Sequence, residues 1–246
     1  MQSRDLLVPV VALLAATRAW SYEPAGTPAD WPNPIPDKLY GMVLSDRLEA
    51  RYADEVDTYV WDVQGWYGGD YNRLWVKTEG EGEQGASPES AELQLLFSRR
   101  FSAFWDWQVG VRHDFEPEPE RSHLVVGLQG VVPYEFEWDS ALFVSDEGDV
   151  TARIEAEYDL RVTQRMVLQP RLEINAAASD VPELGLGSGL NSTELGIRLR
   201  YEFKREIAPY IGVSWEKSYG DTADFSQQEG EPVSVTSFVV GIRAWF

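Results

Sequence analysis

The sequence predicts an all-β protein: a single antiparallel transmembrane β-barrel of twelve strands, of the outer-membrane type. Three observations predict this fold. From Tyr40 onward, apolar and polar residues alternate with period two, and each alternating segment is long enough to cross a bilayer as a tilted strand. Short and long connections also alternate along the chain between these segments, as in outer-membrane barrels.

The alternation is clearest in the stretch "STELGIRLRYEF", where Leu195, Ile197 and Leu199 share one parity and Arg198 and Arg200 share the other. The stretches "DVTARIEAEYDL" and "QRMVLQPRLEIN" repeat the pattern over ten or more residues. A strand of a soluble sandwich usually has about five or six residues, whereas a tilted transmembrane strand needs about nine to eleven. The length therefore favours a membrane barrel.

Twelve segments have this pattern, and an even number is usual for single-chain outer-membrane barrels. They cover residues 40–52, 58–68, 71–81, 89–99, 103–115, 122–132, 135–145, 149–161, 164–176, 191–203, 207–218 and 234–246. The even-numbered connections are short, such as Gly69-Asp70 and Pro133-Tyr134, whereas "SDVPELGLGSGLN" and "DTADFSQQEGEPV" are long. With both termini in the periplasm, the long acidic loops face outside. A soluble up-and-down barrel is the alternative.

The segment before the barrel divides into two parts. Residues 1–19 have Arg4, an apolar run from Leu6 to Ala16 and a small residue at Ala19, which predicts a signal peptide cleaved after Ala19. A short buried helix is the alternative for this run. Residues 20–38 are rich in proline and predict an extended periplasmic tail. The barrel domain is expected to cover residues 39–246.

Composition excludes several classes of protein. The 41 Asp and Glu residues outnumber the 21 Lys and Arg residues, and a net charge of -20 argues against nucleic-acid binding. The absence of Cys excludes disulfides and thiolate metal sites. No window after the first nineteen residues holds ten consecutive apolar residues, so a helical membrane protein is excluded.

Aromatic residues support a place in the outer membrane of a Gram-negative bacterium. The chain has ten Trp residues, and Trp and Tyr cluster near predicted strand ends, as at Trp66-Tyr67 and Trp105. Such residues form girdles at both membrane interfaces, next to outer-membrane lipid. The final stretch "SFVVGIRAWF" ends in an aromatic residue, Phe246, and resembles the signal that the outer-membrane assembly machinery recognises.

Charged residues of both signs take the parity that faces the lumen. The predicted lumen-lining residues are Asp62, Lys77, Glu79, Arg112, Arg153, Glu155, Glu157, Arg171, Glu173, Arg198, Arg200, Glu202, Glu216 and Arg243. Opposite charges on neighbouring strands can pair. A barrel of twelve strands lies between the filled barrels of eight and the channels of sixteen, so these residues form either a plug of ion pairs or a narrow conduit.

Two details of parity lead to further expectations. Asp46 takes the lipid-facing parity, which predicts either a β-bulge or a position near the rim. The carboxylates Glu155, Glu157, Glu173 and Glu202 share the lumen parity, and we hypothesise that they form a weak path for cations.

The chain has only two histidines, His113 and His123, and they flank the acidic stretch "DFEPEPERS". Nitrogen and oxygen donors together suit divalent transition metals, so both are candidate metal ligands. Parity places His113 toward lipid and His123 toward the lumen, which argues against a shared ion, and two histidines at an interface rim are the alternative. Met42 and Met166 take the lipid-facing parity, so no thioether site is expected in the wall.

The sequence predicts no enzyme and no catalytic residues. A serine hydrolase needs a histidine beside its nucleophile. Ser122 adjoins His123 in the sequence only, and neither histidine lies in a serine motif flanked by glycines. A barrel hydrolase would require a nucleophile beside His113 or His123.

The stretch "WDVQGWYGGDYNRLWVKTEGE" resembles the WDxQGWxGGDxxxLWxKTEGE signature of the copper-resistance protein B family of outer-membrane proteins. The resemblance continues through "ELQLLFSRRFSAFWDWQVGVRHDF", "FVSDEGDVTARIEAEYDLRVTQRMVLQPRLEIN", "ELGIRLRYEFKREIAPYIGVSWEKSYGDTADF" and the final "GIRAWF", from about Leu39 to Phe246. It implies a twelve-stranded barrel that works in copper resistance and homeostasis, by binding copper ions or by assisting their export from the periplasm. A periplasmic multicopper oxidase or copper carrier is the implied partner.

This chain departs from the family in one respect. Many members carry a Met- and His-rich domain before the barrel, whereas residues 20–38 contain neither Met nor His. Either a partner delivers the copper, or the lumen carboxylates hold it weakly, or the true start lies upstream of Met1. The alternative function is a general small diffusion channel, or a structural barrel without a copper role.

Overall fold

The computed structural model describes residues 38–246, except for residue 55 and residues 133–135. The predicted signal peptide at residues 1–19 and the proline-rich tail up to residue 37 lie outside the described residues, as does the predicted turn at residues 133–134. The described part of the chain begins two residues before the first strand.

Long strands make up nearly all of the described chain, because the alternating pattern gives each segment one apolar face and one polar face. The strands are β1 (Tyr40–Tyr52), β2 (Thr58–Gly68), β3 (Asn72–Glu83), β4 (Pro88–Arg100), β5 (Trp105–Glu116), β6 (Arg121–Val132), β7 (Phe136–Ser145), β8 (Val150–Tyr158), β9 (Leu160–Arg161), β10 (Met166–Ala177), β11 (Gly189–Tyr201), β12 (Ile207–Ser218) and β13 (Ser234–Trp245). Both β8 and β9 pair with β10, so they are one interrupted strand, and the predicted count of twelve is confirmed.

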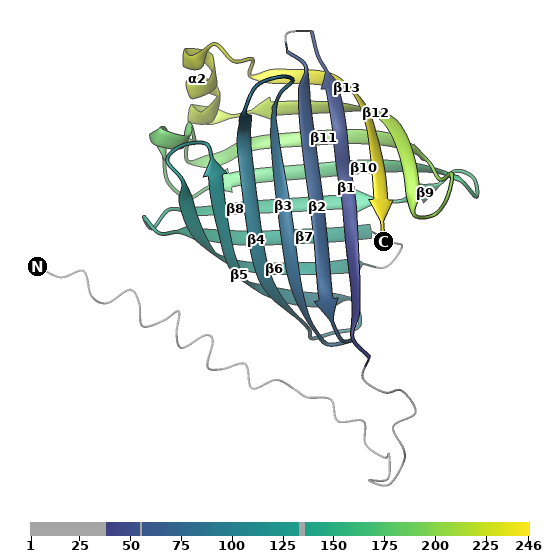
Figure 1. Ribbon diagram of the computed structural model, residues 1–246. Coiled ribbons are helices and arrows are strands. Elements are labelled where there is room, and N and C mark those ends of the chain that lie inside the picture. Colours follow the sequence, from purple (N-terminus) through teal and green to yellow (C-terminus); the bar gives the residue numbers. More distant parts are fainter. Residues whose placement is uncertain (1–37, 55, 133–135) are drawn as a thin grey trace, which may run out of the picture. The chain divides into compact units, whose positions relative to one another are not determined.

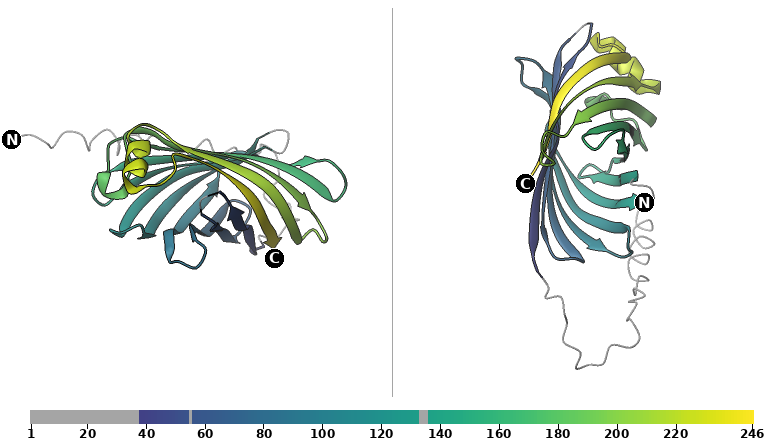
Figure 2. Two further views of the ribbon diagram at one scale, coloured as in Figure 1. Left: turned by 90° about the horizontal axis from the view of Figure 1, so that it is seen from above. Right: turned by 90° about the vertical axis from the view of Figure 1, so that its right-hand side faces the viewer.

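The strands pair with their neighbours in chain order, and the first and last strands close the barrel (Figure 1). In this seam β13 runs antiparallel to β1, with Phe238 opposite Tyr52 and Trp245 opposite Leu44. The backbone of Phe246 extends the seam by exchanging two hydrogen bonds of 2.9 Å with Val43. Figure 2 shows the closed sheet from above and from the side. Closure leaves no unpaired sheet edge, which a barrel in lipid requires.

A β-bulge in β1 confirms the irregularity predicted at Asp46. The register of β1 against β2 shifts between Ser45 and Arg47, and its register against β13 shifts between Ser45 and Glu49. The extra residue turns Asp46 inward, where its carboxylate accepts a hydrogen bond of 2.6 Å from Nε of Arg243. The bulge therefore adds a charge to the lumen that strict alternation would have placed in lipid.

The two faces of the wall differ in character. On β6, Leu124 and Val126 point outward and are 65% and 61% exposed, whereas Val125 points inward and is 1% exposed. Because hydrocarbon surrounds the outward band of such a barrel, these apolar side chains contact lipid. Inside, buried polar residues surround one small apolar cluster, which consists of Trp75, Leu96, Val125 and Phe143.

Two of the loops that the sequence predicts to be long contain short helices. The connection between β10 and β11 contains the 3₁₀ helix η1 (Pro182–Leu184), and that between β12 and β13 contains α2 (Gly220–Glu229). Helix α2 contacts β11 and β12 at the rim of the barrel (Figure 1). In the described part of the chain, no helix has the length and apolar composition needed to cross a bilayer.

Candidate functional site

The lumen is the candidate functional site, because the charged side chains of successive strands converge there. Twelve of the fourteen predicted lumen residues line cavities: Asp62, Lys77, Glu79, Arg112, Arg153, Glu155, Glu157, Glu173, Arg200, Glu202, Glu216 and Arg243. Glu202 lies just beyond the end of β11, at the mouth with the short turns. The remaining two, Arg171 and Arg198, are buried against their carboxylate partners.

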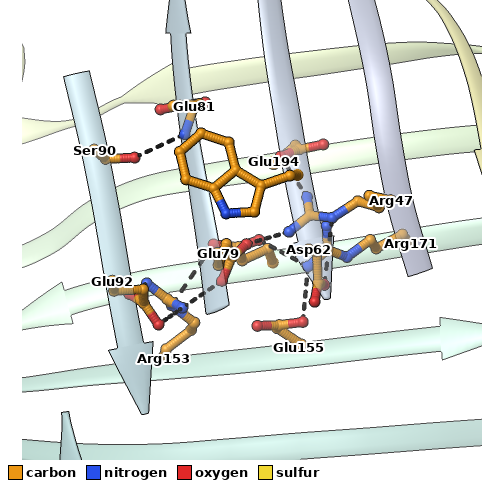
Figure 3. Close-up of polar contacts among 12 residues, drawn as sticks. Arg47, Asp62, Glu79, Glu81, Ser90, Glu92, Arg153, Glu155, Arg171 and Glu194 are labelled. Atoms are coloured by element: carbon orange, nitrogen blue, oxygen red, sulfur yellow. Dashed lines mark hydrogen bonds and ion pairs between the residues drawn. The ribbon is translucent and has the colours of Figure 1, made fainter. Parts of the chain in front are cut away.

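Four side chains from four strands cross the middle of the lumen, and we call them the central ion layer: Arg47 of β1, Glu79 of β3, Glu92 of β4 and Arg153 of β8 (Figure 3). Arg153 donates to Glu79 at 2.8 Å and to Glu92 at 3.0 Å. Arg47 donates to the other carboxylate oxygen of Glu79. Since β8 is five strands from β3 along the barrel, Arg153 spans the lumen rather than following its wall.

A second group of charges surrounds Arg171 of β10. Its guanidinium contacts Glu155 at 2.7 Å, and Glu157 and Glu173 at 3.0 Å each. Three of the four carboxylates hypothesised as a cation path therefore share one arginine, and Glu202 stands apart from them. One positive charge facing three carboxylates leaves this part of the wall negative.

Another ion pair crosses the lumen, between β3 and β7. Nζ of Lys77 donates to Oδ2 of Asp139 at 2.6 Å. Together with the central ion layer, this pair connects walls of the barrel that are not neighbours in the sheet.

Glu49 of β1 is the centre of a third group, the Glu49 cluster, on the wall formed by β1, β11 and β12. Its carboxylate is 4% exposed and accepts hydrogen bonds from Arg198 at 2.5 Å, from Arg51 at 3.2 Å and from Tyr210 at 3.0 Å. Glu194 is the second carboxylate of the cluster and lies 2.9 Å from Arg51 and 3.5 Å from Arg198. The two arginines thus share two carboxylates.

Three cavities follow one another along the lumen. The inner cavity has a volume of about 290 Å³, the central one about 60 Å³ and the outer one about 430 Å³. Asp62 and Glu155 line both the inner and the central cavity, and Glu79 and Arg153 line both the central and the outer cavity. The three cavities therefore adjoin one another, and the smallest of them lies at the central ion layer.

Carboxylates outnumber bases in each of these cavities. The inner cavity is lined by seven Asp and Glu residues and three basic residues. The central cavity has five acidic and two basic residues, and the outer cavity has nine acidic and four basic residues. An excess of one sign within low-dielectric walls focuses the electrostatic potential and raises the local concentration of counter-ions. The lining of all three cavities is therefore acidic.

Helix α2 is held over the outer cavity by a buried threonine. Thr222 accepts hydrogen bonds of 2.9 Å from the backbone N–H of Gly187 and from the side chain of Asn191. The next turn of the helix places Phe225 and Ser226 against the outer cavity. Helix α2 therefore narrows the outer end of the lumen.

Arg121 connects the loop between β7 and β8 to the loop that contains η1. Arg121 of β6 is 3% exposed and donates to Asp149 at 2.6 Å and to Glu183 of η1 at 2.8 Å. The six connections at this end of the barrel contain fourteen Asp and Glu residues and no Lys, Arg or His. The outer surface thus continues the negative charge of the lumen.

The two histidines lie on opposite faces of the wall. Nδ1 of His113 lies 3.0 Å from Oγ of Ser122 on the outward face. His123 points inward and is 8% exposed, with Nδ1 3.7 Å from Oδ2 of Asp114. The two rings cannot bind one ion. Among the residues that the structure describes, no three His, Cys, Asp or Glu side chains are arranged to hold a metal ion.

Sequence reasoning missed several of the most buried lumen residues, namely Arg47, Glu49, Arg51, Glu92 and Glu194. The signal for the first three was present, because they alternate with apolar or small residues in "DRLEARY". The bulge at Asp46 obscured it, since two successive charged residues break the period of two.

Residues 39–246 match the family described as "Copper resistance protein B precursor (CopB)". The chain is 45% identical over 205 residues to the copper resistance protein B of Escherichia coli, an alignment that covers 83% of this chain and 69% of that protein. It is 41% identical over 203 residues to the copper resistance protein B homolog of Pseudomonas syringae pv. tomato, with 82% and 69% covered.

Solved outer-membrane barrels have a similar fold. The NanC porin superimposes with a TM-score of 0.56 at 13% identity, covering 80% of this chain and 98% of the porin. The outer membrane phospholipase A of Escherichia coli gives a TM-score of 0.51 at 13% identity, covering 88% and 94%. At such low identity only the fold is shared. The barrel is an outer-membrane protein.

Proposed function

The chain belongs to the copper resistance protein B family, and from this premise we propose that its barrel conducts copper ions from the periplasm to the outside. Copper is the cargo of the lumen in this proposal. The observation that carries it is the excess of carboxylates in the inner, central and outer cavities alike. Such a lining concentrates cations in all three of these cavities.

The width of the lumen favours ions over larger solutes. The central cavity of about 60 Å³ is lined by Glu79, Arg153 and Lys77, each of which is held in an ion pair. A cation that reaches Glu79 competes with Arg153 for the same carboxylate, so it can pass by exchanging with the guanidinium. A neutral solute has no such means of opening the layer.

Asp114, which lines the outer cavity, and the adjacent His123 form the donor pair most suited to hold copper beside this path. Nδ1 of His123 has no hydrogen-bond partner among the described residues, although the side chain is buried. Imidazole nitrogen together with carboxylate oxygen suits divalent copper. Two ligands bind weakly, which is what release at the outer end requires. His113 lies outside the lumen and takes no part in this path.

A structural barrel without transport is the second candidate. The same central ion layer supports it, because cross-lumen ion pairs can fill a barrel interior as well as gate it. The two functions differ in one measurable respect, the flux of copper across a membrane that contains the protein.

The experiment is copper flux into liposomes that contain the purified full chain, followed with an encapsulated copper-sensitive dye. We expect copper(II) to enter, whereas liposome swelling shows no entry of a neutral pentose. Replacing Glu155, Glu157 and Glu173 by Gln is expected to slow copper entry at least about fivefold, equivalent to about 1 kcal/mol.

The matched control replaces three outer-loop carboxylates, Asp57, Glu118 and Asp224, by their amides. This control loses as many negative charges as the lumen variant, but outside the lumen, and is expected to keep most of the wild-type copper flux. Absence of copper flux in the wild type supports the structural barrel, and equal entry of the pentose supports a general diffusion channel.

A further inference from the structure

One mouth of the barrel has the opposite charge balance to the lumen. Where β9, β11 and β13 end, a cavity of about 400 Å³ opens beside the short turns, which are periplasmic in outer-membrane barrels. We call it the inner mouth, and its lining residues are Asp159, Arg161, Arg200, Glu202, Arg205, Arg243 and Trp245. Four arginines thus face two carboxylates. The ends of β9 and β13 can be followed at the right of Figure 1.

Two of these arginines are held by lumen carboxylates. Arg200 is 3% exposed and donates to Asp159 at 2.5 Å. Arg243 donates to Asp46 at 2.6 Å. Arg243 also lines the inner cavity, so the inner mouth adjoins the lumen at this residue.

The other two arginines, Arg161 and Arg205, are exposed. Within the described part of the chain, neither has a carboxylate within ion-pair distance, although acidic residues outnumber basic ones in the whole sequence. The turn that carries Arg205 is fixed to the last strand, because Nε1 of Trp245 donates to the carbonyl of Arg205 at 2.7 Å and its backbone N–H donates to that of Glu206 at 3.0 Å. A fixed backbone presents this guanidinium to the periplasm.

This charge balance has a consequence for a cation that approaches from the periplasm. The exposed arginines at the entrance repel a free metal ion, even though the lumen beyond attracts it. Carboxylates on a docked protein would neutralise these arginines, since guanidinium and carboxylate form paired, charge-assisted hydrogen bonds. The entrance therefore slows a free ion without excluding it, and delivery by a partner whose carboxylates cover these arginines is faster.

We propose that the inner mouth is a docking site for an acidic segment of a periplasmic protein, whose carboxylates pair with Arg161 and Arg205. The proposal rests on the proposed function and deepens it by naming the chemistry of the partner that delivers the ion. Single exposed ion pairs are weak, so a small anion that pairs with one arginine gains little binding free energy here. Several carboxylates on one chain bind together at a high effective concentration.

The test measures binding of a fluorescein-labelled peptide of ten glutamates to the full chain refolded in detergent micelles, by fluorescence anisotropy at low salt. We expect the wild type to bind the peptide and the variant R161Q/R205Q to bind at least tenfold more weakly. The control R99Q/R165Q loses the same charge at the same end of the barrel from exposed positions outside the cavity. It is expected to bind like the wild type.

Three results would overturn the proposal: no binding to the wild type, equal binding to R161Q/R205Q, or an equal loss in R99Q/R165Q. Displacement of the peptide by a few millimolar sulfate would also overturn it, in favour of a site for small anions. Because peptide binding needs no transport, its failure is distinguishable from a failure of copper flux through the lumen.

Discussion

Glu49 offers a direct test of whether the lumen is held together by its charges. Replacing Glu49 by Gln removes one negative charge from the Glu49 cluster while keeping nearly the same side-chain volume. Arg198 donates at 2.5 Å and 3.2 Å to the two carboxylate oxygens, and Arg51 donates at 3.2 Å to one of them. In Gln one of these oxygens becomes an NH2 donor, so the arginines keep a single neutral acceptor. Both arginines are buried, so water cannot replace the lost partner.

The expected loss of stability follows from these contacts. Removing one partner of a buried ion pair costs about 3–5 kcal/mol, because a charge stays buried without compensation. Glu194 still lies 2.9 Å from Arg51 and 3.5 Å from Arg198, so its negative charge still partly compensates the two arginines. We therefore expect the lower end of that range, about 3 kcal/mol, which is roughly a hundredfold change in the unfolding equilibrium constant.

The assay is unfolding of the refolded barrel by urea in lipid vesicles, followed by tryptophan fluorescence and extrapolated to zero urea. The control is Glu118→Gln, which neutralises an exposed carboxylate in an outer loop. A difference below about 0.5 kcal/mol between the two variants would refute the reasoning, since surface substitutions have effects of that size. The double variant Glu49→Leu/Arg198→Met removes both charges, and we expect it to be more stable than Glu49→Gln.

Three further predictions concern single positions. Thr222→Ala removes two buried hydrogen bonds of about 1 kcal/mol each, so chymotrypsin should cleave α2 roughly thirtyfold faster, and an unchanged rate would show that the helix is held otherwise. Gly80→Ala would place Cβ 2.3 Å from the ring of Trp61 and should destabilise the barrel by about 1–3 kcal/mol in the same urea assay; wild-type stability would mean that the strand can shift. Ser122→Ala should leave the hydrolysis of p-nitrophenyl esters at the background rate of the wild type, because the carboxylate of Glu120 lies 3.7 Å from Nε2 of His113, beyond hydrogen-bond distance, and so does not orient the imidazole beside Ser122; a rate that the substitution abolishes would reveal an enzyme.

The sequence predicts the barrel well, because period and length are local properties. The interruption at Asp159 could not be predicted, since the alternation continues through it; the structure shows its side chain accepting a hydrogen bond of 2.5 Å from Arg200, forty-one residues away. Helix α2 was also missed. Its N-cap residue Tyr219 makes no capping hydrogen bond, so the usual signal for a helix start is absent, and the helix depends instead on the tertiary contacts of Thr222.

Parity predicts which face a side chain takes but not the strand that it meets. His113 and His123 lie on the faces that parity assigns to them. The contact between Arg153 and Glu92 joins residues sixty-one positions apart and depends on strand number and stagger, which set how far the wall curves before it closes. The central ion layer and the charge balance of the inner mouth therefore emerge only in three dimensions.

The ties that cross the lumen have a mechanical consequence. The lateral pressure of the bilayer acts on the wall of a barrel, and a hollow barrel deforms under such pressure by flattening. Lys77 and Asp139 join β3 to β7, and Arg153 joins β8 to β3 and β4, so these pairs act as spokes that set the distance between walls. A substitution that breaks one of these pairs would change the distance between the walls, and with it the cross-section of the barrel that the lipid surrounds. Under the proposed function, an ion that exchanges with one pair at a time leaves the other pairs intact, so the barrel keeps its cross-section.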